Sequence, residues 1–200
     1  MTPMRCWLKS KRAGKQRSSS CRREPKMGKR SNFGRIARDF YETPVEALEP
    51  LLQHLPPAAR YCEPCAGKGA LIDNLDRYGH RCVASFDINP DYNVTTHDAA
   101  FLITPDLNGA ELIITNPPWE RTVLHQLIER FAPLAPTWLL FDADWMHTAQ
   151  SSPHMEICQK IVSVGRVKWF PDTKTKGKDN CCWYLFDAKN VTKSRPFIGR

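Results

Sequence analysis

The chain has 200 residues, with 29 Lys and Arg against 21 Asp and Glu, and a formal net charge of +8. This length fits one globular domain with a short appendage. No apolar stretch approaches the length of a membrane span, and the N-terminus lacks the apolar segment of a secretory signal. The sequence therefore argues against a membrane-spanning and a secreted protein.

The positive charge is concentrated in an N-terminal tail. Residues 1–30 contain eleven Lys and Arg and one acidic residue, Glu24, a net charge of +10, whereas residues 31–200 carry −2. A segment this polar cannot form a core, so residues 1–31 are expected to be disordered when alone. Three interpretations remain open: a phosphate-binding arm, an Arg- and Ser-rich transit peptide, or an upstream extension without a function.

The eight cysteines do not follow the spacing of a small disulfide-linked scaffold. Several lie in predicted core strands, so we expect reduced thiols and a cytoplasmic location. Cys62 and Cys65 form a C-x-x-C pair, but no second pair completes a zinc site, and no metal is predicted. Cys181 and Cys182 are adjacent, so a pleated strand would send them to opposite faces.

The predicted domain, residues 32–188, begins with a helix. Thr43-Pro44-Val45-Glu46 has the T-x-x-E pattern of a capping box, with Pro at the first helical position. Apolar residues at helical spacing follow, and Pro56-Pro57 ends the helix. Residues 189–200 are expected to be a C-terminal tail.

Short apolar strands then alternate with helices. Strands are predicted at residues 60–64, 81–87, 92–98, 111–116, 137–143, 161–170 and 181–187, and helices at residues 70–79, 121–132 and 153–161. The inward residues of the helix at 121–132 are expected to be Val123, Leu124, Leu127, Ile128 and Phe131. This alternation predicts a Rossmann-like α/β fold with a mostly parallel sheet covered by helices on both faces. The last two strands, joined by a polar loop, should form an antiparallel edge.

A Gly-rich turn, Glu63-Pro64-Cys65-Ala66-Gly67-Lys68-Gly69, follows the first strand, and its glycines should supply positive φ. Cys62 and Gly69 stand where a phosphate P-loop needs Gly and Ser or Thr. Asp87 ends the next strand, where an acid can bind ribose hydroxyls. Because Glu63 would repel a pyrophosphate and attract a cation, we expect a sulfonium nucleoside, S-adenosylmethionine, with its adenine beside Asp98.

Asn116-Pro117-Pro118-Trp119 ends the strand at residues 111–116, since proline cannot continue the ladder. An exocyclic amine on an aromatic ring is planar and weakly nucleophilic. The Asn116 side-chain oxygen and the Pro117 carbonyl can accept its two hydrogens and favour the pyramidal form, and Trp119 can stack on the base. We therefore predict Asn116, Pro117, Pro118 and Trp119 to be the catalytic residues.

On these motifs the chain resembles class I S-adenosylmethionine-dependent methyltransferases of the adenine-N6 DNA group, especially the small stand-alone enzymes of phages and prophages. The resemblance extends over residues 32–186 and rests on Asn116–Trp119 as the [DN]-P-P-[YFW] motif. It implies a seven-stranded sheet with an antiparallel edge hairpin, and methyl transfer to adenine N6 in DNA in the cytoplasm of a bacterial or phage-infected cell. The sequence does not determine the oligomeric state, and a monomer is assumed.

The resemblance also implies a set of cofactor-binding residues. Tyr41-Glu42-Thr43-Pro44 matches the segment that closes over the methionine end of the cofactor. The expected cofactor contacts are Tyr41, Thr43, Glu63, Pro64, Ala66, Gly67, Gly69, Asp87, Ile88, Asp98, Ala99 and Asn116. Lys68, a basic residue between the two glycines, departs from the family pattern.

No separate target-recognition domain fits in this length. The predicted nucleic-acid contacts are therefore in the last hairpin: Lys168, Trp169, Lys174, Lys176 and Lys178. Two alternatives remain open. The same construction could methylate RNA or a protein glutamine, although Trp119 favours a heterocycle, or the chain could be a non-catalytic nucleic-acid-binding module.

Overall fold

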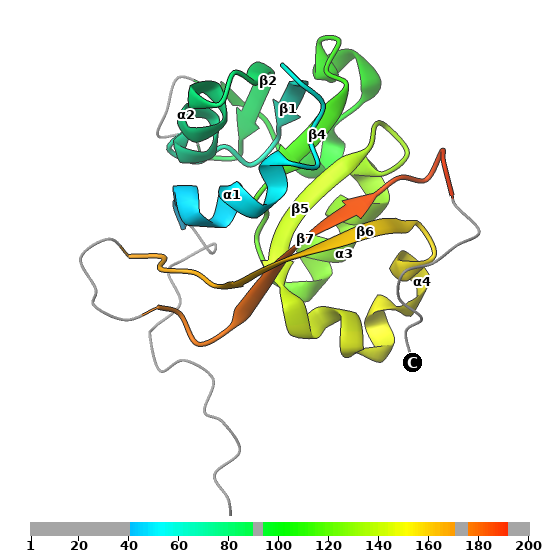
Figure 1. The fold of residues 1–200 in the computed structure, drawn as a ribbon. Helices are drawn as coiled ribbons and strands as arrows, with labels where there is room; N and C mark the ends of the chain where they lie inside the picture. The colour runs from blue at the N-terminus through cyan, green and yellow to red at the C-terminus, as the bar shows by residue number, and fades with distance from the viewer. Residues whose placement is uncertain (1–40, 90–93, 171–175, 192–200) are drawn as a thin grey trace, which may run out of the picture.

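The computed structural model describes residues 41–89, 94–170 and 176–191. The predicted basic tail of residues 1–31, most of the predicted C-terminal tail and Lys174 lie outside the described residues. Within the described residues, a twisted sheet lies between two layers of helices (Figure 1).

Seven strands form one sheet in the order β3-β2-β1-β4-β5-β7-β6. They are β1 (Arg60–Glu63), β2 (Arg81–Asp87), β3 (Thr95–Thr96), β4 (Leu112–Thr115), β5 (Thr137–Asp142), β6 (Cys158–Arg166) and β7 (Asn180–Phe186). β1 to β5 pair in parallel, and β7 is antiparallel to both β5 and β6. The predicted sheet with its antiparallel edge hairpin is confirmed. The strand order reverses between β1 and β4, where ligands bind in open α/β sheets.

Helices cover both faces of this sheet. α1 (Val45–Leu52) and α2 (Ala70–Arg77) pack on one face, and α3 (Arg121–Phe131) and α4 (Ser152–Met155) pack on the other (Figure 1). Four short 3₁₀ turns in the described part of the chain complete the layers: η2 (Ala99–Phe101), η3 (Thr104–Leu107), η4 (Ala143–His147) and η5 (Ala149–Ser151).

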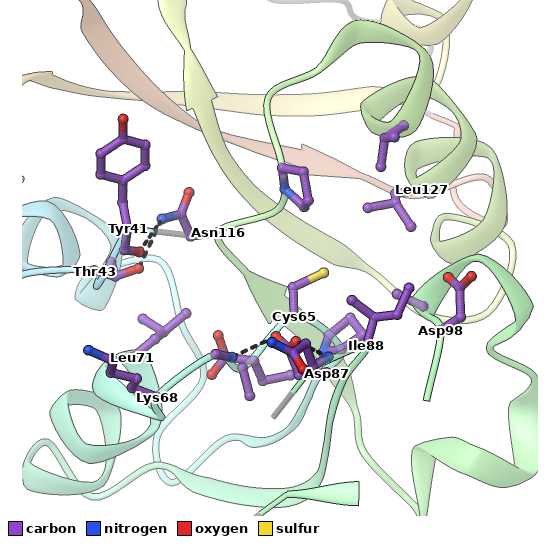
Figure 2. A pocket seen from close by; sticks show the side chains of 18 of the residues that line it. Tyr41, Thr43, Cys65, Lys68, Leu71, Asp87, Ile88, Asp98, Asn116 and Leu127 are labelled. Atoms are coloured by element: carbon purple, nitrogen blue, oxygen red, sulfur yellow. Dashed lines mark hydrogen bonds between the residues drawn. The ribbon is translucent and has the colours of Figure 1, made fainter. Parts of the chain in front are cut away.

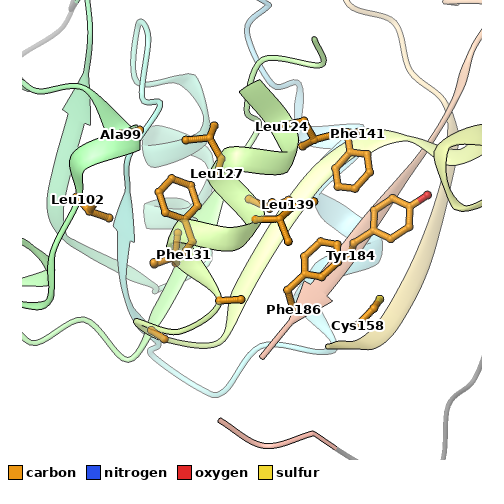
Figure 3. Packing of buried hydrophobic residues seen from close by; sticks show 14 of the residues in the cluster. Ala99, Leu102, Leu124, Leu127, Phe131, Leu139, Phe141, Cys158, Tyr184 and Phe186 are labelled. Carbon is orange, nitrogen blue, oxygen red and sulfur yellow. The ribbon is translucent and has the colours of Figure 1, made fainter. Parts of the chain in front are cut away.

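Two hydrophobic clusters, one on each face, explain why the strands have continuous apolar sequences. In β5, Trp138 packs with the α1 and α2 cluster, whereas Phe141 packs with the α3 and α4 cluster. Figure 3 shows the second cluster, in which Phe141 stacks on Tyr184 of β7 with ring centroids 4.2 Å apart. Cys181 and Cys182 belong to opposite clusters, as predicted.

Three predictions about single elements were wrong or too long. The helix predicted at residues 153–161 stops at Met155, and β6 begins at Cys158, because pairing with β7 outweighs the local helical pattern. The strand predicted at residues 92–98 is reduced, among the described residues, to β3. Val123 is 37% exposed and is not a core residue, because the face of α3 that it shares with Leu127 borders a cavity at this end of the helix.

The predicted capping box at the start of α1 was also wrong. Pro44 is the N-cap, and no side chain caps the helix. The Thr43 hydroxyl accepts a hydrogen bond from Asn116 Nδ2 at 3.2 Å, and the Glu46 carboxylate accepts one from the Lys168 backbone at 2.6 Å. Both side chains make long-range contacts in place of the local ones that their spacing indicates.

The six described cysteines have free thiols. Burial raises the pKa of the Cys158 thiol to about 12, so this side chain is a neutral core residue. Among the described residues, no helix is long and apolar enough to cross a bilayer. In the same part of the chain, no group of three His, Cys, Asp or Glu side chains could hold a metal ion.

Candidate functional site

A cavity of about 1230 Å³ lies at the carboxyl ends of β1, β2 and β4, where the strand order reverses. Twelve predicted site residues line it: Tyr41, Thr43, Glu63, Pro64, Ala66, Gly67, Asp87, Ile88, Asp98, Ala99, Asn116 and Pro118. The lining does not include Gly69, Pro117, Trp119, Lys168, Trp169, Lys176 or Lys178. The structure therefore brings most of the predicted cofactor residues together, and leaves the hairpin residues outside this cavity.

Eleven lining residues were not predicted as site residues: Glu42, Cys65, Lys68, Ala70, Leu71, Asn89, Ala100, Glu120, Val123, Gln126 and Leu127. Most of them are next to a predicted motif in the sequence, so they could have been predicted as neighbours of that motif. Val123, Gln126 and Leu127 lie at i, i+3 and i+4 on α3, one helical face. Their sequence does not reveal that this face meets the cavity.

The Gly-rich turn has the predicted left-handed backbone. Gly67 has φ of 52° and Gly69 has φ of 78°, and Gly69 is the N-cap of α2. Asp87 Oδ2 accepts a hydrogen bond from the Gly67 backbone at 2.8 Å and so ties the turn to the end of β2. Gly69 therefore shapes the turn through its left-handed backbone conformation, although its atoms do not line the cavity.

Glu63 places a buried carboxyl group at the end of β1. It is 2% exposed, and its Oε2 has no hydrogen-bond partner among the described residues. Burial first, and then the negative charge of Asp87, raise the pKa of Glu63 well above its usual value. A buried polar atom of this kind indicates a missing partner, and its position favours a positively charged one.

Asp87 and Asp98 both bind backbone N–H groups. Asp87 Oδ1 accepts from Asn89 at 2.8 Å, and Asp98 Oδ1 accepts from Ala100 at 2.9 Å and caps η2. An ionised carboxylate can accept about four hydrogen bonds, so these contacts leave acceptor capacity facing the cavity. The two acids are thus oriented by the backbone around them.

Residues 41–43, called the strap below, run beside the Gly-rich turn and the end of β4 (Figure 2). Asn116 Nδ2 donates to the Thr43 hydroxyl at 3.2 Å and to the Tyr41 carbonyl at 3.4 Å. Lys68 and Glu42 form an ion pair at 3.3 Å, with both side chains about half exposed. The strap is therefore fastened to both sides of the cavity, and Lys68 is partly neutralised there.

Asn116 and Trp119 are linked within the Asn-Pro-Pro-Trp turn. Trp119 Nε1 donates to Asn116 Oδ1 at 3.2 Å and to the Leu140 carbonyl of β5 at 3.1 Å. Asn116 and Pro118 face the cavity, while the Trp119 ring packs against both hydrophobic clusters. The expected accessible stacking face of Trp119 is not found in the lining.

The β6–β7 hairpin meets the strap through aromatic rings. Trp169 lies 5.9 Å from Tyr41 and 5.6 Å from Trp119 between ring centroids. Glu46 of α1 accepts a hydrogen bond from the Lys168 backbone, and its carboxylate lies 3.7 Å from Lys176 Nζ. Lys176 is thus paired through its ammonium group at the base of the hairpin, whereas Lys168 is bound there through its backbone N–H.

Two acids left unassigned by the sequence have a structural explanation at the end of β5. Asp142 Oδ2 pairs with Arg121 at 2.7 Å, and Asp142 Oδ1 accepts from the Asp144 backbone at 2.9 Å. Asp142 therefore joins the start of α3 to η4.

No family model and no curated protein matches the sequence. Solved structures do match in fold. A type I restriction-modification methyltransferase subunit from Streptococcus thermophilus aligns with a TM-score of 0.52 and 8% identity, over 78% of this chain and 46% of that chain. The M protein of the type I restriction enzyme EcoKI gives 0.50 and 12%, over 80% and 47%. The 23S rRNA methyltransferase ErmE gives 0.50 and 16%, over 78% and 72%.

The chain has a Rossmann-like methyltransferase fold. It spans about half the length of the two type I proteins. At these identities the likeness is one of fold, so the chemistry of this methyltransferase fold is argued from its own cavity. That cavity occupies the crevice where the strand order reverses, as expected for open α/β sheets.

Proposed function

We propose that this chain is an S-adenosylmethionine-dependent methyltransferase that transfers a methyl group to the exocyclic N6 amine of adenine in DNA. One observation carries the proposal: a single cavity joins the buried Glu63 and the Gly-rich turn to Asn116. A nucleoside-binding site alone would account for the first two features. The amide at the other side of the same cavity supplies the acceptor that amine methylation needs.

The residues present fit the cofactor. An ionised carboxylate buried without a partner is unstable, and a sulfonium is a cation that would stabilise the charged form of Glu63. Asp87 suits ribose hydroxyls, because it ends β2 directly beside the Gly-rich turn. Asp98 and the exposed Ile88 are proposed to hold the adenine ring, and the strap is proposed to hold the methionine end.

The chain's own groups then prepare the target amine. When bound, S-adenosylmethionine supplies an electrophilic methyl group on a sulfonium leaving group. Asn116 Oδ1 is proposed to accept one amine hydrogen and the Pro117 carbonyl the other, which frees the nitrogen lone pair. The new N–C bond forms as the C–S bond breaks with its electron pair left on sulfur. The extra proton on nitrogen then leaves to water, so no general base is required before transfer.

Nucleic acid is the proposed partner, contacted by Lys168, Trp169, Lys174, Lys176 and Lys178 of the hairpin. Lys176 and Lys178 are both exposed, and Lys176 would exchange its pairing with Glu46 for a phosphate. The target base would be extruded from the duplex to reach Asn116. RNA is the second candidate, because one structure of similar fold is an rRNA methyltransferase.

A methyl-transfer assay tests the proposal. The purified full chain is incubated with radiolabelled S-adenosylmethionine and with DNA, RNA or a protein mixture in separate reactions, and DNA products are digested to nucleosides. We expect label in N6-methyladenine from DNA, and none with Asn116→Ala. Label only in RNA or only in protein glutamine would mean that DNA is not the substrate. No transfer despite cofactor binding would indicate a non-catalytic module.

A further inference from the structure

Two histidines and a tryptophan meet where α3 packs against η4 and α4. The Trp145 indole N–H donates a hydrogen bond to His125 Nε2 at 3.0 Å. The His154 ring lies beside both, with its centroid 4.5 Å from that of His125 and 6.2 Å from that of Trp145. Trp145 is fully buried, and His154 is 6% exposed. None of these three side chains lines the cavity, so the proposed function does not use them.

These contacts require both imidazole rings to be neutral. A ring nitrogen that accepts an indole N–H must carry a lone pair, so His125 Nε2 is unprotonated in this arrangement. His154 Nε2 lies 4.0 Å from Glu129 Oε1, too far for a hydrogen bond, and the Glu129 side chain is 69% exposed. A charged His154 would therefore be buried without a close partner, which is unfavourable.

We propose that His125, His154 and Trp145 form a pH-sensitive switch, which holds residues 143–157 against α3 at neutral pH and releases them when either imidazole takes up a proton. A proton on His125 Nε2 would place an N–H group against the indole N–H. A proton on His154 would create a charge that only exposure to water can stabilise. The switch goes beyond the proposed function and does not depend on it.

The charged groups around the two rings keep them neutral at pH 7. The pKa of His125 is lowered first by burial and then by the positive charge of Arg121, whereas Glu129 and Glu120 oppose this shift. The pKa of His154 is lowered first by burial and then by His125, and Glu129 opposes it. Both pKa values therefore lie below the ordinary 6.5, and the switch responds to acid.

The lowered pKa values also fix the direction of the pH dependence. Between these values and 6.5, the released segment binds more protons than the packed one, so packing weakens as pH falls through this window. The segment follows the carboxyl end of β5, which pairs with β4, the strand that leads to Asn116. Acid should therefore loosen the sheet edge beside the proposed active site.

A magnetic-resonance titration of the full chain from about pH 7.5 to about pH 4.5 tests the switch directly. The Trp145 indole N–H resonance is identified by its loss in Trp145→Phe, and the two ring resonances by their loss in His125→Gln and His154→Gln. We expect the indole resonance to shift with the midpoint of one of these rings, below 6.5. Trp145→Phe should raise the midpoint of His125, because the lost hydrogen bond favours the neutral ring. An indole resonance that follows neither ring, or ring midpoints at or above 6.5, would overturn the proposal.

Hydrogen exchange followed by mass spectrometry reports the release of the segment. After correction for the intrinsic exchange rate, we expect acid to lower the protection of residues 143–157 about 3- to 10-fold, the effect of losing one hydrogen bond, and to leave β1 and β4 protected. The double variant His125→Gln, His154→Phe keeps an acceptor for the indole and a ring beside it, yet cannot titrate, so it should lack this acid response. His147→Gln is the matched control, because it replaces an exposed histidine of the same segment and should keep the response.

Three results of the exchange experiment would contradict the switch. They are unchanged protection of the wild-type segment in acid, an acid response that persists in the double variant, and a response that disappears in His147→Gln. The first of these needs no variant, so the test stands even if the double variant does not fold. Neither measurement involves methyl transfer, so failure of the switch is distinguishable from failure of the proposed function.

Discussion

Replacing Glu63 with Gln tests two effects of its buried carboxylate: the cost in folding free energy and the contribution to cofactor binding. Glu63 is 2% exposed, and its Oε2 has no hydrogen-bond partner among the described residues. Gln keeps the shape and removes the charge. Because a buried charge without a partner is costly and Gln cannot carry one, we expect Glu63→Gln to stabilise the cofactor-free protein by roughly 1–3 kcal/mol at a pH at which wild-type Glu63 is ionised. In a domain of this size, this is a rise of roughly 2–12 °C in Tm.

The stability gain should depend on pH in a defined direction. Burial raises the pKa of Glu63 above the ordinary 4.5, so between the two values the folded protein binds more protons than the unfolded chain. Wild-type stability therefore falls as pH rises through this window. Gln does not titrate, so its advantage in unfolding free energy should widen across the window and stay constant above it.

The same substitution should weaken S-adenosylmethionine binding about 10- to 100-fold, roughly 1.4–2.7 kcal/mol, because it removes the charge opposite the sulfonium. S-adenosylhomocysteine has no positive charge on sulfur, so its affinity should change by less than about twofold. Titration calorimetry with both ligands and thermal unfolding over a pH series measure these effects. An equal loss of affinity for both ligands, or a lower Tm, would refute the reasoning.

Three further changes give separate tests. Glu42→Gln should weaken S-adenosylmethionine binding a few-fold, because Lys68 lies 3.3 Å from Glu42 and would lose this counter-charge. The loss of affinity should be smaller at high salt, where the charge of Lys68 is screened. Calorimetry at two salt concentrations measures this effect, and equal losses at both would contradict it. Asp142→Asn should lower the unfolding free energy by about 0.5–1 kcal/mol, since it breaks the partly exposed pair with Arg121; an unchanged urea midpoint would exclude the pair as a stabilising contact. Deleting residues 1–26 should weaken DNA binding and flatten its salt slope by about 0.9 per lost phosphate contact, so an identical slope would remove the tail from the interface.

The sheet was predictable because its strands are covered on both faces. Neighbouring residues such as Leu139 and Leu140 of β5 are both fully buried, in opposite clusters, and this produces uninterrupted apolar runs that stand out in the sequence. α4 and the start of β6 were not predictable, because the pairing of Cys158 with Phe186 across the chain decides that region. Local helical spacing carries no information about such a partner.

The site was predictable where chemistry follows a strand end directly, as at Glu63, Asp87 and Asn116, which all line one cavity. Prediction from the sequence failed where a side chain has two possible partners. Thr43 fits a capping box by spacing, yet binds Asn116, which is 73 residues away. Trp119 likewise fits a stacking surface by type, and its indole N–H is bonded within the fold.

Among the described residues β7 is the last strand in sequence, and it lies between β5 and β6. Phe186 follows Asp142 by 44 residues, so at synthesis rates of about 5–20 residues per second β5 lacks this partner for roughly 2–9 s after it is made. During that time its apolar edge is open to other chains. Insertion of β7 between β5 and β6 is therefore the event that covers this edge of the sheet and protects it from aggregation.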